Sequence, residues 1–247
     1  MSIDVLHNSG WEPGHYDYPG ELAFVLVVQD ERRVQWWTQR LGSVLIAAVE
    51  QRGRVPLRAH VQSWDTALRE DYHEVHVIDA GAMPAAAFEN LRLKNTLLSL
   101  HYIGHTGEVR TSSMQWANGD ALANFLEKLF ANLGGHAIFG MCWEHYLRHH
   151  RQPGRRFGCH VHAADWQSLL PALLNFAEQA WQATSAILLL GGDQHCTLGN
   201  YVEICSWLEG LLPAQCLITV SVLPSAHGKC SATLLLTTYE AKGKSLL

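Results

Sequence analysis

The chain has 247 residues, of which 48% are hydrophobic and 17% charged, and its formal net charge is −5. This composition is typical of a compact folded protein and excludes a disordered chain. The net negative charge argues against a nucleic-acid partner, because such surfaces are basic. No apolar run reaches the roughly 20 residues of a membrane-spanning helix, so we also expect no membrane segment.

The first residues, MSIDVLHNSGW, lack the basic start and the apolar core of a signal peptide. The chain contains six cysteines. Disulfides are rare in proteins that stay in the cytoplasm. We therefore expect free thiols and a cytoplasmic location.

Strands and helices alternate along the first part of the chain. It opens with a valine-rich apolar run, typical of a strand covered on both faces, and a segment with apolar residues at helical spacing follows. Asp120 is the expected N-cap of the second helix, which ends at a glycine pair. In chain order we expect a strand at 21–28, a helix at 34–53, strands at 55–61, 73–80 and 97–104, a helix at 119–135 and a strand at 136–142.

The second part of the chain continues the alternation and then changes. The segment PSAHGK separates the last two apolar runs, and its glycine is typical of a hairpin turn. The expected elements are a strand at 156–162, a helix at 165–181, a strand at 185–192, a helix at 198–212 and strands at 216–223 and 230–239.

This order of elements predicts an α/β fold with a layered, mostly parallel sheet flanked by helices and a C-terminal antiparallel hairpin. We expect residues 1–192 to form a Rossmann-like domain. Residues 193–247 are expected to close its sheet or to form a small subdomain. Such folds carry their chemistry at the carboxyl ends of the strands.

Two residues at predicted strand ends form a candidate catalytic dyad. His105 follows the strand at 97–104, and Cys142 ends the next predicted strand. If these strands are parallel neighbours, a right-handed crossover brings both side chains to one edge, where the imidazole can take the proton of the thiol. The backbone N–H groups of Gly104 and Gly107 are candidates for an oxyanion site. The alternative is that Cys142 is a core residue and His105 a turn residue.

The segments LHYIGHTG and AIFGMCWE carry a resemblance to a known family. Within residues 97–144, an apolar strand ending near a histidine and a second ending in a cysteine resemble the caspase-like cysteine peptidases of the CHAT group. The resemblance implies a polypeptide substrate, with His105 as the general base and Cys142 as the nucleophile.

A second resemblance competes with the first. Residues 191–237 are similar to the carboxy-terminal domain of the FtsZ/tubulin group: a glycine pair, a Thr-Leu helix start, a helix and two strands follow in that order. The segment VVQDERR stands where the first phosphate loop would follow the first strand, and it has no glycine. Backbone amides approach phosphates closely only where side chains are absent. This resemblance implies a non-hydrolysing scaffold that assembles or binds a protein partner. It is also compatible with an oligomer.

Two further clusters of polar residues remain. His145 and His149 are four residues apart and share a helix face, which suits a metal ion if Cys159 completes the site. The alternative is a histidine-rich exposed helix, and we predict no metal and no cofactor. Glu74 and His76 point to the same side of their strand, and we interpret them as polarity at a strand end.

Overall fold

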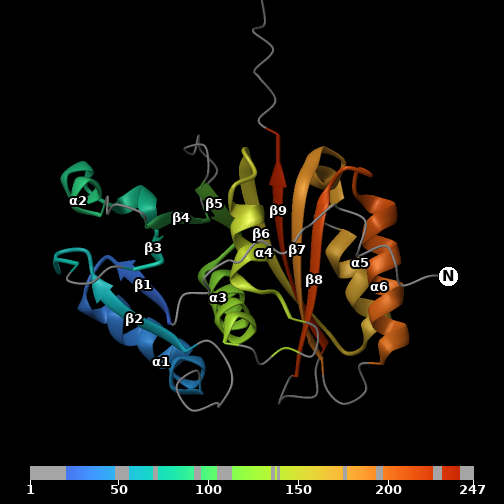
Figure 1. Ribbon diagram of the computed structural model, residues 1–247, viewed down its shortest axis with the longest axis horizontal. Coiled ribbons are helices and arrows are strands. Elements are labelled where there is room, and N and C mark those ends of the chain that lie inside the picture. Colours follow the sequence, from blue (N-terminus) through green and yellow to red (C-terminus); the bar gives the residue numbers. More distant parts are fainter. Residues whose placement is uncertain are drawn as a thin grey trace, which may run out of the picture.

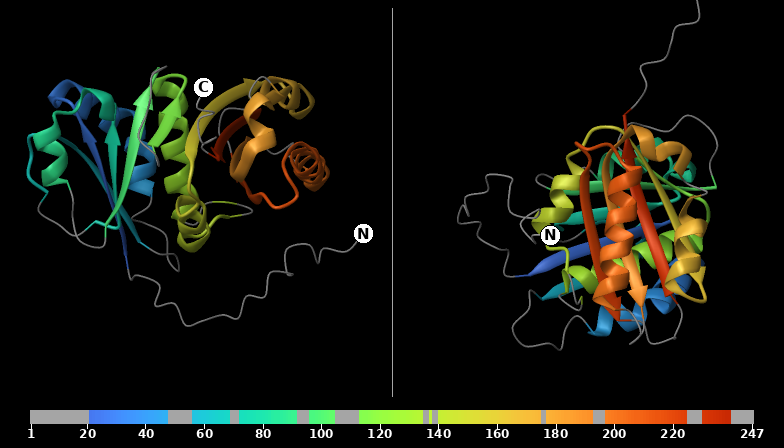
Figure 2. Two further views of the ribbon diagram at one scale, coloured as in Figure 1. Left: turned by 90° about the horizontal axis from the view of Figure 1, so that it is seen from above. Right: turned by 90° about the vertical axis from the view of Figure 1, so that its right-hand side faces the viewer.

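The computed structural model describes the chain over a series of segments that together contain a single nine-stranded sheet. Helices lie on both faces of this sheet (Figure 1, Figure 2). Within the described residues, no helix is both long and apolar enough to cross a bilayer. The described segments are 21–47, 56–68, 72–91, 96–104, 113–134, 137, 140–174, 177–192, 197–224 and 230–239.

The strands follow the order β2-β1-β3-β4-β5-β6-β9-β7-β8 across the sheet. Every neighbouring pair is parallel except the two pairs that β9 makes, with β6 and with β7. The carboxyl ends of all the other strands therefore share one edge of the sheet. The strands are β1 (Leu22–Val28), β2 (Leu57–Ser63), β3 (Glu74–Ile78), β4 (Leu97–Ile103), β5 (Ser113–Trp116), β6 (Arg155–Ala163), β7 (Ala183–Gly192), β8 (Leu217–Pro224) and β9 (Cys230–Thr238).

The helices divide between the two faces and bury three apolar clusters. One cluster joins α1, α3 and α4 to one face of the sheet, and a second joins α5 and α6 to the opposite face of β6 to β9. A third, smaller cluster covers that opposite face at β1, β3 and β4. The helices are α1 (Glu31–Ala47), η2 (Ala80–Ala82), α2 (Ala85–Asn90), α3 (Gly119–Leu133), α4 (Trp143–His150), α5 (Trp166–Leu174), η3 (Ala177–Gln182) and α6 (Leu198–Leu211).

The structure confirms the α/β class, the mostly parallel sheet with flanking helices and the antiparallel pairing near the C-terminus. The antiparallel partners of β9 are β6 and β7, whereas β8 pairs in parallel with the other side of β7. The N-cap of α3 is Asn118, whose side chain accepts a hydrogen bond from the backbone of Ala121, rather than Asp120. The division of the chain at residue 192 stays a prediction.

Candidate functional site

Cys142 lies at the start of α4, where it is the half-buried N-cap residue. The described residues around it, 137 and 140–142, belong to no strand. In the sheet, β4 lies between β3 and β5. The expectation that a strand ending at Cys142 lies beside β4 is therefore wrong. Among the described residues, Cys142 contacts the imidazole of His145, one turn along the helix, and this hydrogen bond raises the pKa of His145.

The predicted oxyanion loop begins at the carboxyl end of β4. Gly104 has a φ of +63°, a left-handed conformation that glycine adopts readily. Its N–H donates to the carbonyl oxygen of Trp116 at 2.9 Å, so this donor already serves the β4–β5 connection. His105 and Gly107 lie outside the described residues, and their positions stay predictions.

The three candidate metal ligands occupy different environments. His145 is exposed, whereas His149 is buried, with its Nε2 atom 2.8 Å from the hydroxyl of Thr219 on β8. Burial lowers the pKa of His149 to about 3. Cys159 lies in the cluster on the α5 side of the sheet, where burial raises the pKa of its thiol to about 12. Across the part of the chain that the structure describes, no group of three or more His, Cys, Asp or Glu side chains could hold a metal ion.

A chain of hydrogen bonds crosses the sheet beneath α4. The indole N–H of Trp116 can only donate, so Nδ1 of His101, 3.0 Å away, accepts. Burial lowers the pKa of His101 to about 3 and holds the pKa of His76 well below its usual range, so both rings are neutral. His101 therefore carries its hydrogen on Nε2 and donates it to Nδ1 of His76 at 3.0 Å. The hydrogen of His76 then lies on Nε2, which points toward Glu74.

Glu74 is the end of this chain and is fully buried. Its Oε2 atom lies 3.6 Å from Nε2 of His76, too long for a normal hydrogen bond. Its Oε1 atom accepts from the hydroxyl of Tyr146 at 2.9 Å and from that of Ser99. Burial raises the pKa of Glu74 to about 8, although hydrogen bonds from Ser99 and Tyr146 oppose the shift. A mostly protonated carboxyl group thus ties α4 to β3 and β4.

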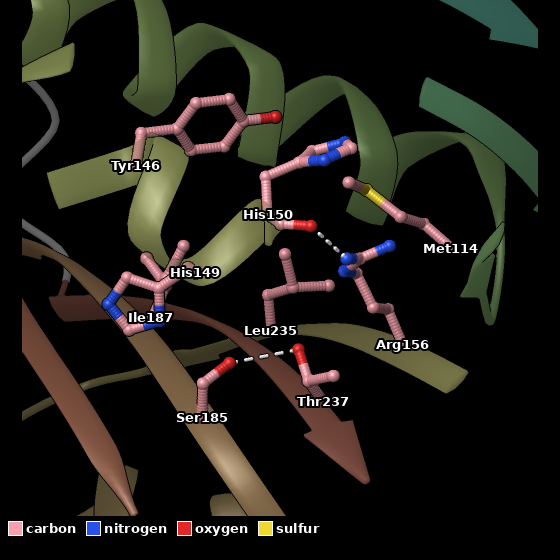
Figure 3. A pocket seen from close by; sticks show the side chains of 9 residues that line it. All are labelled: Met114, Tyr146, His149, His150, Arg156, Ser185, Ile187, Leu235 and Thr237. Carbon is pink, nitrogen blue, oxygen red and sulfur yellow. Dashed lines mark hydrogen bonds between the residues drawn. The ribbon is translucent and has the colours of Figure 1, made fainter. Parts of the chain in front are cut away.

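The buried network has no space for a substrate. Glu74, His76, Ser99 and His101 are all 0% exposed. A cavity beside it, shown in Figure 3, measures about 10 Å³ and is lined by residues that include Tyr146 and His149. This is about the space that one water molecule needs. We therefore assign the network a structural role, in which it fixes α4 on the sheet.

A much larger depression opens at the carboxyl ends of β1 and β2. It has a volume of about 420 Å³ and lies where α/β sheets bind their ligands. Asp30 caps the start of α1: its Oδ1 atom accepts a hydrogen bond from the backbone N–H of Arg33 at 3.0 Å. This helix start therefore carries its own carboxylate where a bound phosphate would otherwise accept from the amides. The lining residues are Asp30, Glu31, Arg32, Ser63 and Asp65.

The chain has the fold of the FtsZ and CetZ proteins. It matches CetZ from Methanosaeta thermophila with a TM-score of 0.60 at 10% identity, over 89% of this chain and 87% of that one. The TM-score is 0.51 for CetZ2 from Haloferax volcanii, solved as a GTPγS-bound protofilament, at 11% identity over 89% and 94% of the two chains. It is also 0.51 for an FtsZ variant from M. jannaschii, at 9% identity over 89% and 92%. No protein-family model and no curated protein matches the sequence.

These structures overturn the expectation of a caspase-like cysteine peptidase. The matched proteins are FtsZ and CetZ, in agreement with the second resemblance. The depression at β1 and β2 does not fit the phosphates of a nucleotide such as GTP. Its three carboxylates, from Asp30, Glu31 and Asp65, outnumber the guanidinium of Arg32, and like charges in one site repel.

The absence of glycine in VVQDERR was evident from the sequence, whereas the depression that this segment lines was not predicted. The available signal was the position of Asp30 and Glu31 directly after the first strand, and of Asp65 after the second. The position of Glu74 and His76 inside the core, rather than at a solvated strand end, was not predicted either. For these two residues the signal was weaker, because strand alternation alone does not tell which face is covered.

Proposed function

We propose that this chain is a non-enzymatic assembly protein that acts through contacts between its own copies and does not hydrolyse GTP. The similarity to the FtsZ and CetZ structures supports the proposal, and one of those structures is described as a protofilament. The similarity concerns the fold alone, so the case for this chain rests on its own residues.

The observation that carries the proposal is the chemistry at the start of α1. The backbone N–H of Arg33 is already bonded to the carboxylate of Asp30, and Glu31 adds a second negative charge in the first helical turn. Negative side chains are stabilising at a helix N-terminus, for the same reason that phosphates bind there. The acidic side chains of the protein thus take the place of a phosphate ligand. We therefore expect an assembly that needs no nucleotide.

Exposed apolar side chains lie at two ends of the C-terminal half and are the contact surfaces we propose. Trp181 is 67% exposed and Tyr239 64%, and the N–H of Tyr239 donates to the carbonyl of Gln182 at 3.3 Å, so these aromatics lie near the start of β7. Leu198 and Val202, 65% and 54% exposed, lie at the start of α6, the helix that follows the other end of β7 in the chain. The ten residues of β7 span about 30 Å. Two different patches at opposite ends suit a head-to-tail contact.

The nucleotide part of the proposal is tested by titrating the purified chain with a fluorescent GTP analogue in the presence of Mg²⁺. Phosphate release and the sedimenting fraction are measured in the same samples. We expect no saturable binding, no phosphate release and the same sedimentation with GTP, with GDP and without nucleotide. Binding in the micromolar range, or sedimentation that requires GTP, would refute it.

The assembly part is tested by comparing Trp181→Ser and Leu198→Ser with Trp36→Ser by sedimentation velocity over a range of concentrations. Trp36 is also exposed, at 40%, but lies on α1 in the other half of the molecule. We expect each of the first two variants to weaken self-association at least tenfold and the Trp36 variant to behave as the parent chain. A parent chain that stays monomeric at every concentration, or equal losses in all three variants, contradicts the proposed contact.

A further inference from the structure

Two histidines of β6 form a close pair that the assembly proposal does not use. His160 and His162 are separated by one residue of the strand and therefore project from the same face. Their Nε2 atoms lie 2.9 Å apart, and their rings are nearly perpendicular, at 85°. His162 is exposed and His160 half-buried, so solvent reaches the pair.

A hydroxyl group on the neighbouring strand holds the pair in place. Nδ1 of His160 lies 2.7 Å from Oγ1 of Thr233, its direct partner on β9. A hydrogen bond from the second ring nitrogen is the usual support of an imidazole that binds a metal, because it directs the other nitrogen outward. Burial lowers the pKa of His160 to about 3, so its ring is unprotonated at neutral pH.

We propose that His160 and His162 chelate a divalent transition-metal ion, copper(II) or nickel(II), through their Nε2 atoms. Metal–imidazole bonds are about 2.0 to 2.1 Å long, so nitrogens 2.9 Å apart subtend an angle of about 90° at the metal. This angle is that of neighbouring ligands in square-planar and tetragonal coordination, which these two ions prefer. A tetrahedral zinc site would need nitrogens about 3.3 Å apart. Water fills the remaining positions.

The charged groups near the pair do not prevent binding of a cation. The amine of Lys128 donates to the hydroxyl of Ser231 at 3.0 Å, and burial lowers the pKa of this lysine to about 7, so much of its charge is absent at neutral pH. The guanidinium of Arg40 pairs with the carboxylate of Glu127 at 2.7 Å.

The buried pair of His76 and His101 shows that short distance alone does not make such a site. These rings have nitrogens 3.0 Å apart, but both are 0% exposed. The donor group of Trp116 also fixes the direction of their hydrogen bond. An incoming ion would have to displace that hydrogen bond inside the core. The Nε2 atoms of the pair on β6 also share a hydrogen bond, but His162 faces solvent, so an ion can displace this bond at the surface of the protein.

The test is isothermal titration of the chain with Ni²⁺, together with electron paramagnetic resonance of the Cu²⁺ complex, for the parent chain, His162→Gln and His145→Gln. His145 is the matched control: it is an exposed histidine that lies on α4, away from β6. We expect saturable binding that His162→Gln weakens at least tenfold and His145→Gln leaves unchanged, with nitrogen couplings in the Cu²⁺ spectrum lost only in His162→Gln.

A second variant separates chelation from general surface binding. Thr233→Val keeps both imidazoles but removes the hydroxyl that orients His160, and loss of such support typically weakens metal binding 10- to 100-fold. Circular dichroism verifies that each variant is folded. The proposal is abandoned if Ni²⁺ shows no saturable binding, or if His162→Gln binds it as tightly as the parent chain does.

Discussion

Trp116 determines how two buried histidines carry their hydrogens. Its N–H can only donate, and the direction of this one bond sets the tautomer of His101 and then that of His76. Neutral rings need no counter-ion, which is why imidazoles are tolerated in a core where charged groups would be costly. The polar residues of β3 and β4 thus form a directed chain rather than a set of isolated buried groups.

Replacing Trp116 by Phe tests this chain. The substitution leaves Nδ1 of His101 buried without a donor, which we expect to lower the free energy of unfolding by about 1 to 3 kcal/mol. Urea denaturation measures the change. Trp36→Phe is the control, and because Trp36 is partly exposed we expect a change within about 0.5 kcal/mol. Equal stability of both variants would show that the indole donor contributes nothing.

The interpretation of Glu74 and His76 as strand-end polarity was wrong, and the reason is physical. A period of two residues shows which side chains share a face of a strand, but not whether that face meets solvent or a helix. The sequence contained one unused indication: Ser99 and His101 repeat the polar alternation on β4, and His76 and Ser99 are direct partners in the ladder. Polar positions that line up on two adjacent strands, within apolar runs, indicate an internal network.

The contact between strands β5 and β6 depends on the absence of a side chain at Gly158. Gly158 is paired with Trp116, and a Cβ atom at this glycine would lie 2.1 Å from the indole ring. Real Cβ atoms do not approach so closely, so the ring or the strand would have to move. This glycine therefore allows the large side chain of Trp116 to lie over the neighbouring strand.

Gly158→Ala is expected to lower the free energy of unfolding by about 1 to 3 kcal/mol, because overpacking displaces the indole ring. Gly42→Ala is the matched substitution: a Cβ at this position in α1 has nothing within 4 Å. Alanine there should raise stability by about 0.5 to 1 kcal/mol, because glycine is unfavourable inside a helix. Thermal and urea unfolding of both variants measure the difference, and a loss of stability in Gly42→Ala would contradict the prediction.

Most strands and helices could be predicted from long apolar runs in the sequence. Which strands pair with one another could not be predicted in this way. Strands β1, β7 and β9 and helix α6 agree with their predicted ranges to within a few residues, because burial on both faces or on one stripe leaves a clear pattern. The four residues of β5 are too few to show one. Of the described residues in the predicted strand at 136–142, Met141 is buried in the main cluster without belonging to a strand. The strand predicted there was the reason for placing Cys142 beside β4, and the pairing of Cys142 with His105 stays a prediction.

Five buried or half-buried histidines predict a strong loss of stability in mild acid. Their pKa values are lowered chiefly by burial, to about 3 for four of them and well below the usual range for the fifth. Between pH 3 and 6.5 the unfolded chain therefore binds more protons than the folded one. Stability falls as the pH decreases through this window, by about 1.4 kcal/mol per pH unit for each histidine. The residues are His76, His101, His149, His150 and His160.

Urea unfolding at pH 7.5, 6.0 and 5.0 tests this dependence. Glu74 acts in the opposite direction, because its raised pKa of about 8 means that the folded chain holds a proton that the unfolded chain loses above about pH 4.5. His145, whose pKa is also raised, acts in the same direction as Glu74. These two groups are outnumbered by the five histidines, so we expect the urea midpoint to fall steeply below pH 6.5. A midpoint that is constant between pH 7.5 and 5.0 would show that these rings titrate normally in the folded chain.

The order of synthesis and the order of the sheet differ at β9. This strand is the last of the described strands along the chain, yet every one of its residues is buried, because it lies between β6 and β7. While a ribosome is still making it, β6 and β7 each present an unpaired edge, and such edges recruit strands from other chains. The nascent protein should therefore depend on chaperones until residues 230–238 have emerged, and premature stop codons before this strand should yield insoluble products rather than shorter folded ones.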